Sequence, residues 1–215
     1  TNINIFEKNH ETYNHIAPEI IERLYSNEGA VPVDSLDFAA DIEPQDCFIL
    51  KSNRSSILVR YNQETGMVMR VEKERSFGIE PRNAEQAFAM NVLLDDDVKL
   101  VALTGKSGTG KTLLALAAAL QKNEHYKQIL LARPIVALAN KDLGFLPGDE
   151  KQKIAPYMQP LFDNLSVIKH VYNPRSPEYL KIEELVRDEK LIITPLAYIR
   201  GRSLSNIFFI VDEAQ

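Results

Sequence analysis

The chain has 215 residues, of which 45% are apolar and 26% are charged, and these values exclude a fully disordered protein. Its 25 Lys and Arg residues against 30 Asp and Glu residues leave a net charge of −5, which excludes a uniformly basic nucleic-acid-binding protein but not a local basic patch. A single cysteine, Cys47, excludes an intramolecular disulfide framework and fits a reducing, cytoplasmic location.

No stretch of the sequence has the pattern of a membrane span or a signal peptide. The longest apolar runs, such as residues 113–120, fall far short of the roughly 20 residues that a membrane-spanning helix needs. The N-terminal residues lack the charged-then-apolar pattern of a signal peptide. We therefore expect no membrane association. Because the first residue is Thr1 and not Met, we expect the chain to begin inside a longer protein.

The first third of the chain is predicted to be a helix followed by a small β unit. Apolar residues recur with helical spacing between Ile16 and Leu24, and Gly29 and Pro32 end that segment. Two apolar stretches separated by a polar turn with Gly66 then indicate a hairpin. The expected elements are a helix over 16–24, a strand over 48–50 and hairpin strands over 56–61 and 67–72.

Beyond residue 83, short apolar stretches alternate with helical segments. Such alternation is typical of a parallel sheet with helices on its faces, and we expect its first strand to be buried. Because the composition shifts near residues 78–81, we predict a β-rich linker domain over 1–77 and an α/β domain over 78–215. The expected elements are helices over 84–94 and 111–121 and strands over 100–103, 129–132, 191–194 and 208–211.

A phosphate-loop motif follows the first of these strands. The full pattern G-x-x-x-x-G-K-[ST] is matched by Gly105, Lys106, Ser107, Gly108, Thr109, Gly110, Lys111 and Thr112. The glycines let such a loop wrap a phosphate, and the helix that follows presents its positive N-terminal end. Lys111 can reach the β- and γ-phosphates, and the Thr112 hydroxyl can bind Mg²⁺. We therefore predict an α/β fold of the P-loop NTPase (RecA-like) class that binds ATP and Mg²⁺.

A pair of carboxylates follows the last predicted strand. Asp212 is expected at the carboxyl edge of the sheet, where it can hold Mg²⁺ through water. Glu213 beside it can polarise the attacking water. An apolar run that ends in Asp-Glu is by itself more often a plain strand end, but downstream of a phosphate loop it indicates hydrolysis. We assign catalytic roles to Lys111, Asp212 and Glu213, and metal ligation to Thr112 and Asp212.

Two amide side chains precede the phosphate-loop strand. Asn83 and Gln86 could read the donor and acceptor edge of adenine, with Gln86 preferred. The alternative is a helix start with solvated polar residues, in which Asn83 is the N-cap.

Basic residues late in the chain are candidate nucleic-acid contacts. Arg200 and Arg202 follow a Thr-Pro at a strand end and could bind RNA phosphates or stabilise developing charge, whereas the alternative is a solvated basic loop. Lys151 and Lys153, at the start of an expected helix, are second candidates. Arg133 ends another strand, and for it a site role and a structural loop both stay open.

Together these motifs resemble the PhoH-like family of ATPases over roughly residues 78–215. The stretches that carry the resemblance are 105–112, Arg133-Pro134, 144–151, Pro156-Tyr157, Pro160-Leu161, 199–202 and 211–215. Residues 48–51 and 55–62 resemble the β linker that joins a PIN-type ribonuclease domain to a PhoH-like ATPase. The resemblance implies an ATP-driven, helicase-like RNA-handling protein, often a ring of identical subunits. It also implies coupling to RNA cleavage by a nuclease domain that would precede Thr1.

Two other functions stay open. A small-molecule kinase also uses a phosphate loop, but the adjacent carboxylates and the lack of an arginine-rich lid segment argue against it. A module that binds ATP without hydrolysing it is the second alternative.

In helicase-like folds a central strand follows the Asp-Glu strand in sequence, so we expect the natural chain to continue past Gln215. We expect this chain alone to be weak or inactive as an ATPase.

Overall fold

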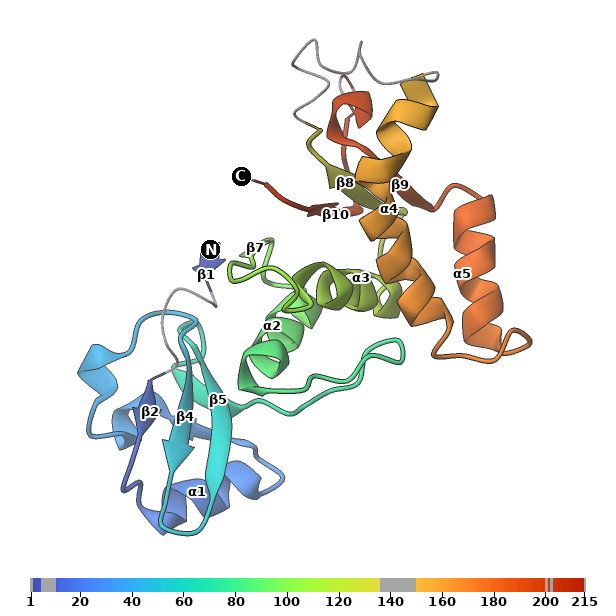
Figure 1. Ribbon diagram of the computed structural model, residues 1–215. Coiled ribbons are helices and arrows are strands. Elements are labelled where there is room, and N and C mark those ends of the chain that lie inside the picture. Colours follow the sequence, from blue (N-terminus) through green and yellow to red (C-terminus); the bar gives the residue numbers. More distant parts are fainter. Residues whose placement is uncertain (1, 5–10, 136–149, 200, 202, 215) are drawn as a thin grey trace. The chain divides into compact units, whose positions relative to one another are not determined.

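The computed structural model describes residues 2–4, 11–135, 150–199, 201 and 203–214 (Figure 1). The chain divides into two compact units. Unit 1 combines residues 1–74 with 80–109, and unit 2 combines residues 75–79 with 110–215. Each unit is therefore assembled from two separate stretches of sequence.

Unit 1 contains a five-stranded sheet in the order β2-β4-β5-β6-β3. The predicted hairpin between β5 and β6 is present. Its turn is held by Asn62, whose Oδ1 accepts the N–H groups of Glu64 and Thr65 at 2.9 and 3.2 Å, and by Gly66 at a φ of 66°. The strands are β2 (Thr12–Tyr13), β3 (Ala30–Pro32), β4 (Cys47–Lys51), β5 (Ser56–Asn62) and β6 (Met67–Arg70).

Helix α1 (Pro18–Tyr25) covers this sheet and contacts β3 and β6. The helix begins two residues later than predicted, with Pro18 in its first turn, where the missing proline N–H leaves no helical hydrogen bond unmade. Tyr13 and Phe38 stack with ring centroids 3.6 Å apart at the edge of the core.

The interior of unit 1 is apolar, and burial there raises the pKa of the Cys47 thiol on β4 to about 12. The core residues are Ile21, Leu24, Val31, Leu36, Phe48, Leu50, Ile57, Val59 and Val68.

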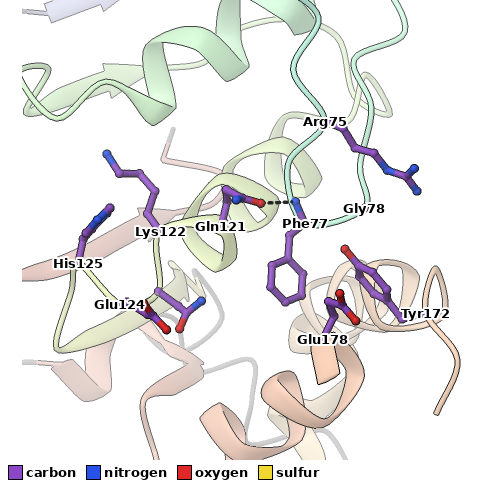
Figure 2. Close-up of a pocket in the computed structure, with 10 residues that line it drawn as sticks. Arg75, Phe77, Gly78, Gln121, Lys122, Glu124, His125, Tyr172 and Glu178 are labelled. Carbon is purple, nitrogen blue, oxygen red and sulfur yellow. Dashed lines mark hydrogen bonds between the residues drawn. The ribbon is translucent and has the colours of Figure 1, made fainter. Parts of the chain in front are cut away.

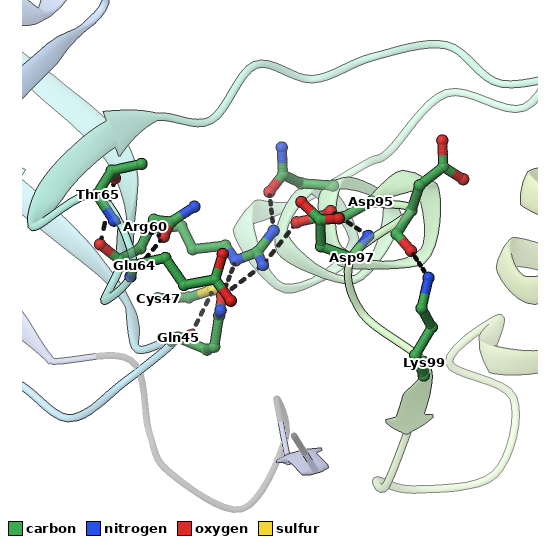
Figure 3. Close-up of polar contacts among 11 residues, drawn as sticks. Gln45, Cys47, Arg60, Glu64, Thr65, Asp95, Asp97 and Lys99 are labelled. Carbon is green, nitrogen blue, oxygen red and sulfur yellow. Dashed lines mark hydrogen bonds and ion pairs between the residues drawn. The ribbon is translucent and has the colours of Figure 1, made fainter.

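Arg60 of β5 ties the sheet of unit 1 to helix α2 (Ala84–Leu94), as Figure 3 shows. The Arg60 side chain is only 9% exposed, and one of its terminal nitrogens lies 2.8 Å from Asp95 Oδ2, just after α2. Its Nε donates to Gln45 Oε1 at 2.8 Å, and its other terminal nitrogen donates to Asn91 Oδ1 at 3.2 Å. A buried guanidinium is tolerated only when it is paired and hydrogen-bonded, and these partners provide both.

A second sheet of unit 1 pairs β1 (Asn2–Asn4) in parallel with β7 (Leu100–Ala102). The expectation that β7 is buried is wrong, because Leu100 is 57% exposed. Among the described residues, β1 is the only strand that pairs with β7. A strand with a single partner leaves its other edge uncovered.

Unit 2 contains a three-stranded parallel sheet in the order β10-β8-β9, with α3 in contact with β8 and β10 and with α4 and α5 in contact with β9 (Figure 1). Parallel strands joined by helices are the predicted α/β arrangement. The central strand β8 is the most buried, because its residues 129–132 are all buried. The elements are α3 (Lys111–Gln121), β8 (Gln128–Arg133), α4 (Glu150–Lys169), α5 (Pro177–Arg187), β9 (Leu191–Pro195), η5 (Leu196–Ile199) and β10 (Ile207–Val211).

Helix α4 runs for 20 residues although Pro156 and Pro160 lie inside it. Proline interrupts helical hydrogen bonding, so its presence alone would predict a break. Both prolines are exposed, whereas the residues spaced by three and four along the opposite face are buried and hold the helix to the unit: Ile154, Met158, Leu161, Leu165 and Ile168. In the parts of the chain that the structure describes, no helix combines the length and apolarity that crossing a membrane requires.

Residues 75–79 belong to unit 2, although the stretches on either side of them belong to unit 1. They form a tight turn, with Phe77 at a φ of 42° and Gly78 at 81°. The Phe77 N–H donates to Gln121 Oε1 at the end of α3 at 2.8 Å, and the Phe77 ring meets Tyr172 edge-on at 5.6 Å (Figure 2). The predicted domain boundary between residues 77 and 78 falls inside this turn and stays a prediction.

Candidate active site

The phosphate loop lies between β7 and α3. Its three glycines have φ values of 140°, 78° and 85° in chain order, a region that residues with a Cβ rarely adopt. Residues 105–109 are exposed, and within them the Thr109 hydroxyl donates to the Lys106 carbonyl at 2.9 Å. Residues 105–109 belong to unit 1 and residues 110–112 to unit 2.

Helix α3 begins at Lys111, where the sequence predicts it. Gly110 caps the helix in a left-handed conformation. From Leu114 to Leu120 every residue is buried, so packing in unit 2 fixes the helix. Its first turn therefore presents the half-buried Lys111 and Thr112 together with the positive end of the helix dipole, as phosphate binding requires.

The structure brings Thr112 and Asp212 together, although 100 residues separate them. The Thr112 hydroxyl donates to Asp212 Oδ1. Asp212 directly follows β10, and its own N–H donates to the Ala132 carbonyl of β8 at 2.8 Å. Its position is therefore fixed by the sheet, and its side chain is 10% exposed.

The donor chemistry of Thr112 and Asp212 fits Mg²⁺. A hydroxyl and a carboxylate are both oxygen ligands, and Mg²⁺ in nucleotide sites usually takes one or two carboxylates together with phosphates and waters. Within the described part of the chain, no group of three or more His, Cys, Asp or Glu residues is placed to hold a metal. A metal bound by this pair would therefore need nucleotide phosphates and waters to complete its ligands.

Arg133, whose role the sequence leaves open, contacts the same carboxylate. Its Nε lies 2.9 Å from Asp212 Oδ2, and one terminal nitrogen donates to that oxygen as well. Its other terminal nitrogen donates to the Tyr157 carbonyl of α4 at 3.0 Å. The parallel register pairs Ala132 with Val211, so the residues that follow these two meet at one edge of the sheet. The signal in the sequence is a strand-end arginine, but its partner depends on a register that no local pattern encodes.

Glu213 follows Asp212 in an unusual backbone conformation. Its φ is 52°, in the left-handed region that non-glycine residues seldom occupy. Such conformations cost of order 1–3 kcal/mol and cluster at functional sites. The side chain of Glu213 is exposed, whereas that of Asp212 is largely covered. The two neighbouring carboxylates thus have different surroundings, as different roles would require.

Asn83 and Gln86 lie at the start of α2 in unit 1. Asn83 Oδ1 accepts the Gln86 N–H at 2.9 Å, so Asn83 is the N-cap. Gln86 Oε1 accepts the Arg82 N–H at 2.8 Å, and Gln86 Nε2 donates to the Thr109 carbonyl of the phosphate loop at 3.1 Å. These bonds use one N–H and one lone pair of an amide that has two of each. Gln86 therefore connects α2 to the loop and retains the chemistry to read adenine.

The predicted nucleic-acid contacts are only partly visible. Arg200 and Arg202 lie outside the described residues. Lys151 and Lys153 lie in the first turn of α4, and Lys153 is half-buried.

A cavity of about 490 Å³ opens in unit 2 at the C-terminal end of α3 (Figure 2). Phe77, Lys122, His125 and Tyr172 are among the residues that line it, and none of the predicted site residues does. Because phosphate loops bind their ligand on an exposed loop and helix end, this cavity does not mark the nucleotide site.

The fold and the site define a class. A parallel α/β sheet, a glycine-rich loop that opens α3 and a strand-end carboxylate on the phosphate-loop threonine define a P-loop NTPase. The family model described as PhoH-like protein matches residues 78–215. The chain belongs to the PhoH-like protein family, which confirms the resemblance seen in the sequence. This membership supports ATP binding and ATPase function in general terms.

Individual relatives agree with this assignment. Protein PhoH2 of Bacillus subtilis (strain 168) is 44% identical over 167 residues, which are 75% of this chain and 37% of the relative. Protein PhoH2 of Mycolicibacterium smegmatis is 36% identical over 203 residues, which are 93% of this chain and 44% of the relative. A PhoH-like protein of Synechocystis is 47% identical over 113 residues, which are 52% of this chain and 32% of the relative. The chain thus spans less than half the length of each of these relatives.

Proposed function

We propose that this chain binds ATP with Mg²⁺ through residues 105–112 and hydrolyses it. The contact between Thr112 and Asp212 carries this proposal, because it joins the last residue of the phosphate loop to the strand-end carboxylate. A simple glycine-rich turn would not need that carboxylate on its threonine. The pairing is the one that a nucleotide-bound Mg²⁺ requires.

The roles of the residues follow from their positions. Lys111, in the first turn of α3, binds the β- and γ-phosphates. Thr112 and Asp212 are the residues that would hold the metal, and Mg²⁺ bound there would neutralise charge on the β- and γ-phosphates. Glu213, exposed beside Asp212, orients a water for attack on the γ-phosphate and accepts its proton.

Adenine recognition is assigned to Gln86, with Asn83 as the weaker candidate. Gln86 already contacts the phosphate loop through the Thr109 carbonyl, so its amide lies beside a residue that would border the bound nucleotide. Asn83 uses its side-chain oxygen to cap α2, which leaves its NH₂ group for a base.

We further propose that hydrolysis drives RNA remodelling or unwinding in the cytoplasm. The support is the resemblance of the motifs, together with Arg200, Arg202, Lys151 and Lys153 as local cations on a chain of net charge −5. In the full protein we expect a ring of identical subunits and a PIN-type nuclease domain ahead of this chain. The relatives are more than twice as long as the stretches that match, which leaves room for further domains in them.

Phosphate release from ATP by the purified chain, with and without single-stranded RNA, tests this function. Because this chain alone is expected to be a weak ATPase, we expect slow but Mg²⁺-dependent release, which Lys111→Ala abolishes. Lys127→Ala, a change of an exposed lysine outside the loop, is expected to leave the slow release intact. Release without any added acceptor argues against a kinase. Binding of ATP without release, even in a single turnover, would instead identify a non-hydrolysing module. Hydrolysis by Lys111→Ala at the rate of the unsubstituted chain would refute the site.

A further inference from the structure

Both oxygens of the Asp212 carboxylate accept hydrogen bonds from side chains of unit 2. Thr112 donates to Oδ1, and Arg133 donates to Oδ2 through both Nε and a terminal nitrogen. The side chain of Arg133 is 19% exposed and that of Asp212 is 10% exposed, so solvent screens the attraction between them only partly. The proposed metal ligand is therefore already neutralised by a cation of this chain.

The sheet holds Arg133 at this position. Arg133 is the last residue of β8, and the ladder continues past β10 through the hydrogen bond from the Asp212 N–H to the Ala132 carbonyl. Arg133 and Asp212 thus start from adjacent points on neighbouring parallel strands. Their contact is set by the backbone register and not by a mobile surface side chain.

A guanidinium and a divalent cation oppose each other at one carboxylate. The two hydrogen bonds from Arg133 occupy lone pairs of Oδ2, and its positive charge repels a second cation a few ångströms away. Binding of Mg²⁺ at Asp212 therefore competes with Arg133, whether the two cations exchange places or share the carboxylate.

The third N–H group of Arg133 extends this competition to α4. It donates to the Tyr157 carbonyl at 3.0 Å, in the N-terminal half of that helix. Helix α4 itself packs on α3 and β9. If the Arg133 guanidinium moves away from Asp212, its hydrogen bond to the Tyr157 carbonyl changes as well.

We propose that Arg133 is a positioning residue that holds Asp212 in place of the metal, weakens metal binding there, and transmits metal occupancy to α4 through the Tyr157 carbonyl. This inference rests on the proposed function, because it takes Asp212 to be a metal ligand. It adds a regulatory role for a residue that touches neither the nucleotide loop nor water-activating Glu213 in the described contacts.

The test measures metal binding directly. Mn²⁺ is titrated into the full chain with a non-hydrolysable ATP analogue, and free Mn²⁺ is counted by electron paramagnetic resonance. Arg133→Gln is expected to bind Mn²⁺ roughly tenfold more tightly, since a neighbouring unit charge shifts cation binding at a carboxylate by about one order of magnitude or more. Arg133→Lys, which keeps the charge but loses the two-donor geometry, is expected to fall between. Arg187→Gln, which removes an exposed ion pair with Asp188 on α5, is the matched control and is expected to leave Mn²⁺ affinity unchanged.

A second measurement compares the unsubstituted chain with Arg133→Gln. Amide hydrogen exchange in the N-terminal half of α4 is expected to change when metal and nucleotide bind to the unsubstituted chain. In Arg133→Gln that change is expected to disappear, because the link through Tyr157 is gone.

The possible failures are distinct. If the unsubstituted chain binds neither nucleotide nor Mn²⁺, the proposed function and this inference both fall. If it binds both, but Arg133→Gln binds Mn²⁺ equally or more weakly, the proposed function stands and the competition is refuted. If Arg133→Gln does not fold, Arg133→Lys is the deciding variant. The inference is overturned if Arg133→Lys binds Mn²⁺ no more tightly than the unsubstituted chain and shows the same amide hydrogen exchange in α4.

Discussion

Arg60 in unit 1 and Arg133 in unit 2 make the same kind of contact for different ends. Each arginine lies on a strand, and its side chain pairs with an aspartate just beyond the end of another element. These aspartates are Asp95 after α2 and Asp212 after β10. Arg60 gives its remaining N–H groups to the amides of Gln45 and Asn91, whereas Arg133 gives one to a helix carbonyl.

The difference lies in what the carboxylate does next. Asp95 ends a helix and completes the connection between the sheet and α2. Asp212 also accepts a hydrogen bond from Thr112, so its pair with Arg133 lies beside the last residue of the phosphate loop. A buried Arg–Asp pair is therefore scaffold or site according to the third group on the carboxylate, and measurements that separate stability from ligand binding can tell the two apart.

The largest effect is expected on the site side, at Glu213. Glu213→Gln is expected to slow hydrolysis by roughly 10²–10⁴-fold, the usual loss when a general base is removed, with nucleotide affinity nearly unchanged. Glu189→Gln is the matched control, because Glu189 is also exposed and also has a positive φ, 55°. Steady-state phosphate release and equilibrium nucleotide binding measure the two quantities.

Asp212→Asn should instead weaken the Mg²⁺-dependent binding of nucleotide. Equal losses of nucleotide affinity in Glu213→Gln and Asp212→Asn would contradict these roles.

On the scaffold side, Arg60→Ala is expected to lower the free energy of unfolding by about 3–5 kcal/mol, because it removes the cation that pairs with the partly buried Asp95. Urea denaturation gives this value, and Mn²⁺ affinity should stay the same. Arg23→Ala, which breaks a surface pair with Glu28 where the arginine is 54% exposed, should cost no more than about 1 kcal/mol. A change in metal affinity with Arg60→Ala as large as that with Arg133→Gln would erase the distinction between the two arginines.

Two glycines with similar backbone conformations sharpen the comparison further. Gly78→Ala places a Cβ 2.8 Å from Val171 Cγ1 at a φ of 81°, whereas Gly66→Ala has open space at a φ of 66°. Both variants acquire left-handed strain of about 1–2 kcal/mol, and Gly78→Ala adds a steric clash of about 1 kcal/mol or more. Thermal or urea unfolding is expected to rank Gly78→Ala as the less stable. Equal losses would mean that the turn at 75–79 shifts freely on unit 2.

The smallest effect is expected at the helix caps. Asn83→Ala should cost about 1 kcal/mol of stability, like Ser176→Ala, whose hydroxyl caps α5 by accepting the Tyr179 N–H at 3.3 Å. Asn83→Ser restores a capping oxygen, and with it the stability. Titration with an ATP analogue then separates the two readings of Asn83: affinity that recovers in Asn83→Ser indicates a cap alone, and affinity that stays low indicates an adenine contact.

Helices with local end signals could be predicted to the residue. Asn83 ahead of α2 and Gly110 ahead of α3 are start signals that act within one turn, and both helices have the predicted bounds. The phosphate loop could also be identified, because phosphate binding needs its glycines, Lys111 and Thr112 at that fixed spacing. The parallel strands of unit 2 were found to within a residue at each end because each is a short apolar stretch.

Features that depend on distant partners could not be predicted. Strand β1 is Asn-Ile-Asn, which is too short to be recognised as a strand from its sequence, and its partner β7 lies far along the chain. The continuity of α4 past its prolines depends on a buried face that appears only when the helix is packed. The contact of Arg133 with Asp212 depends on the register of β8 against β10. In each case the determining energy comes from residues far away in the sequence.

The turn at residues 75–79 has a topological consequence. The backbone passes between the two units three times, at 74/75, 79/80 and 109/110, so no single peptide-bond cleavage can release one unit from the other. A protease would have to cut at all three crossings. An expressed fragment that starts at residue 78, where the family match begins, would lose Phe77 and with it the hydrogen bond to Gln121 at the end of α3.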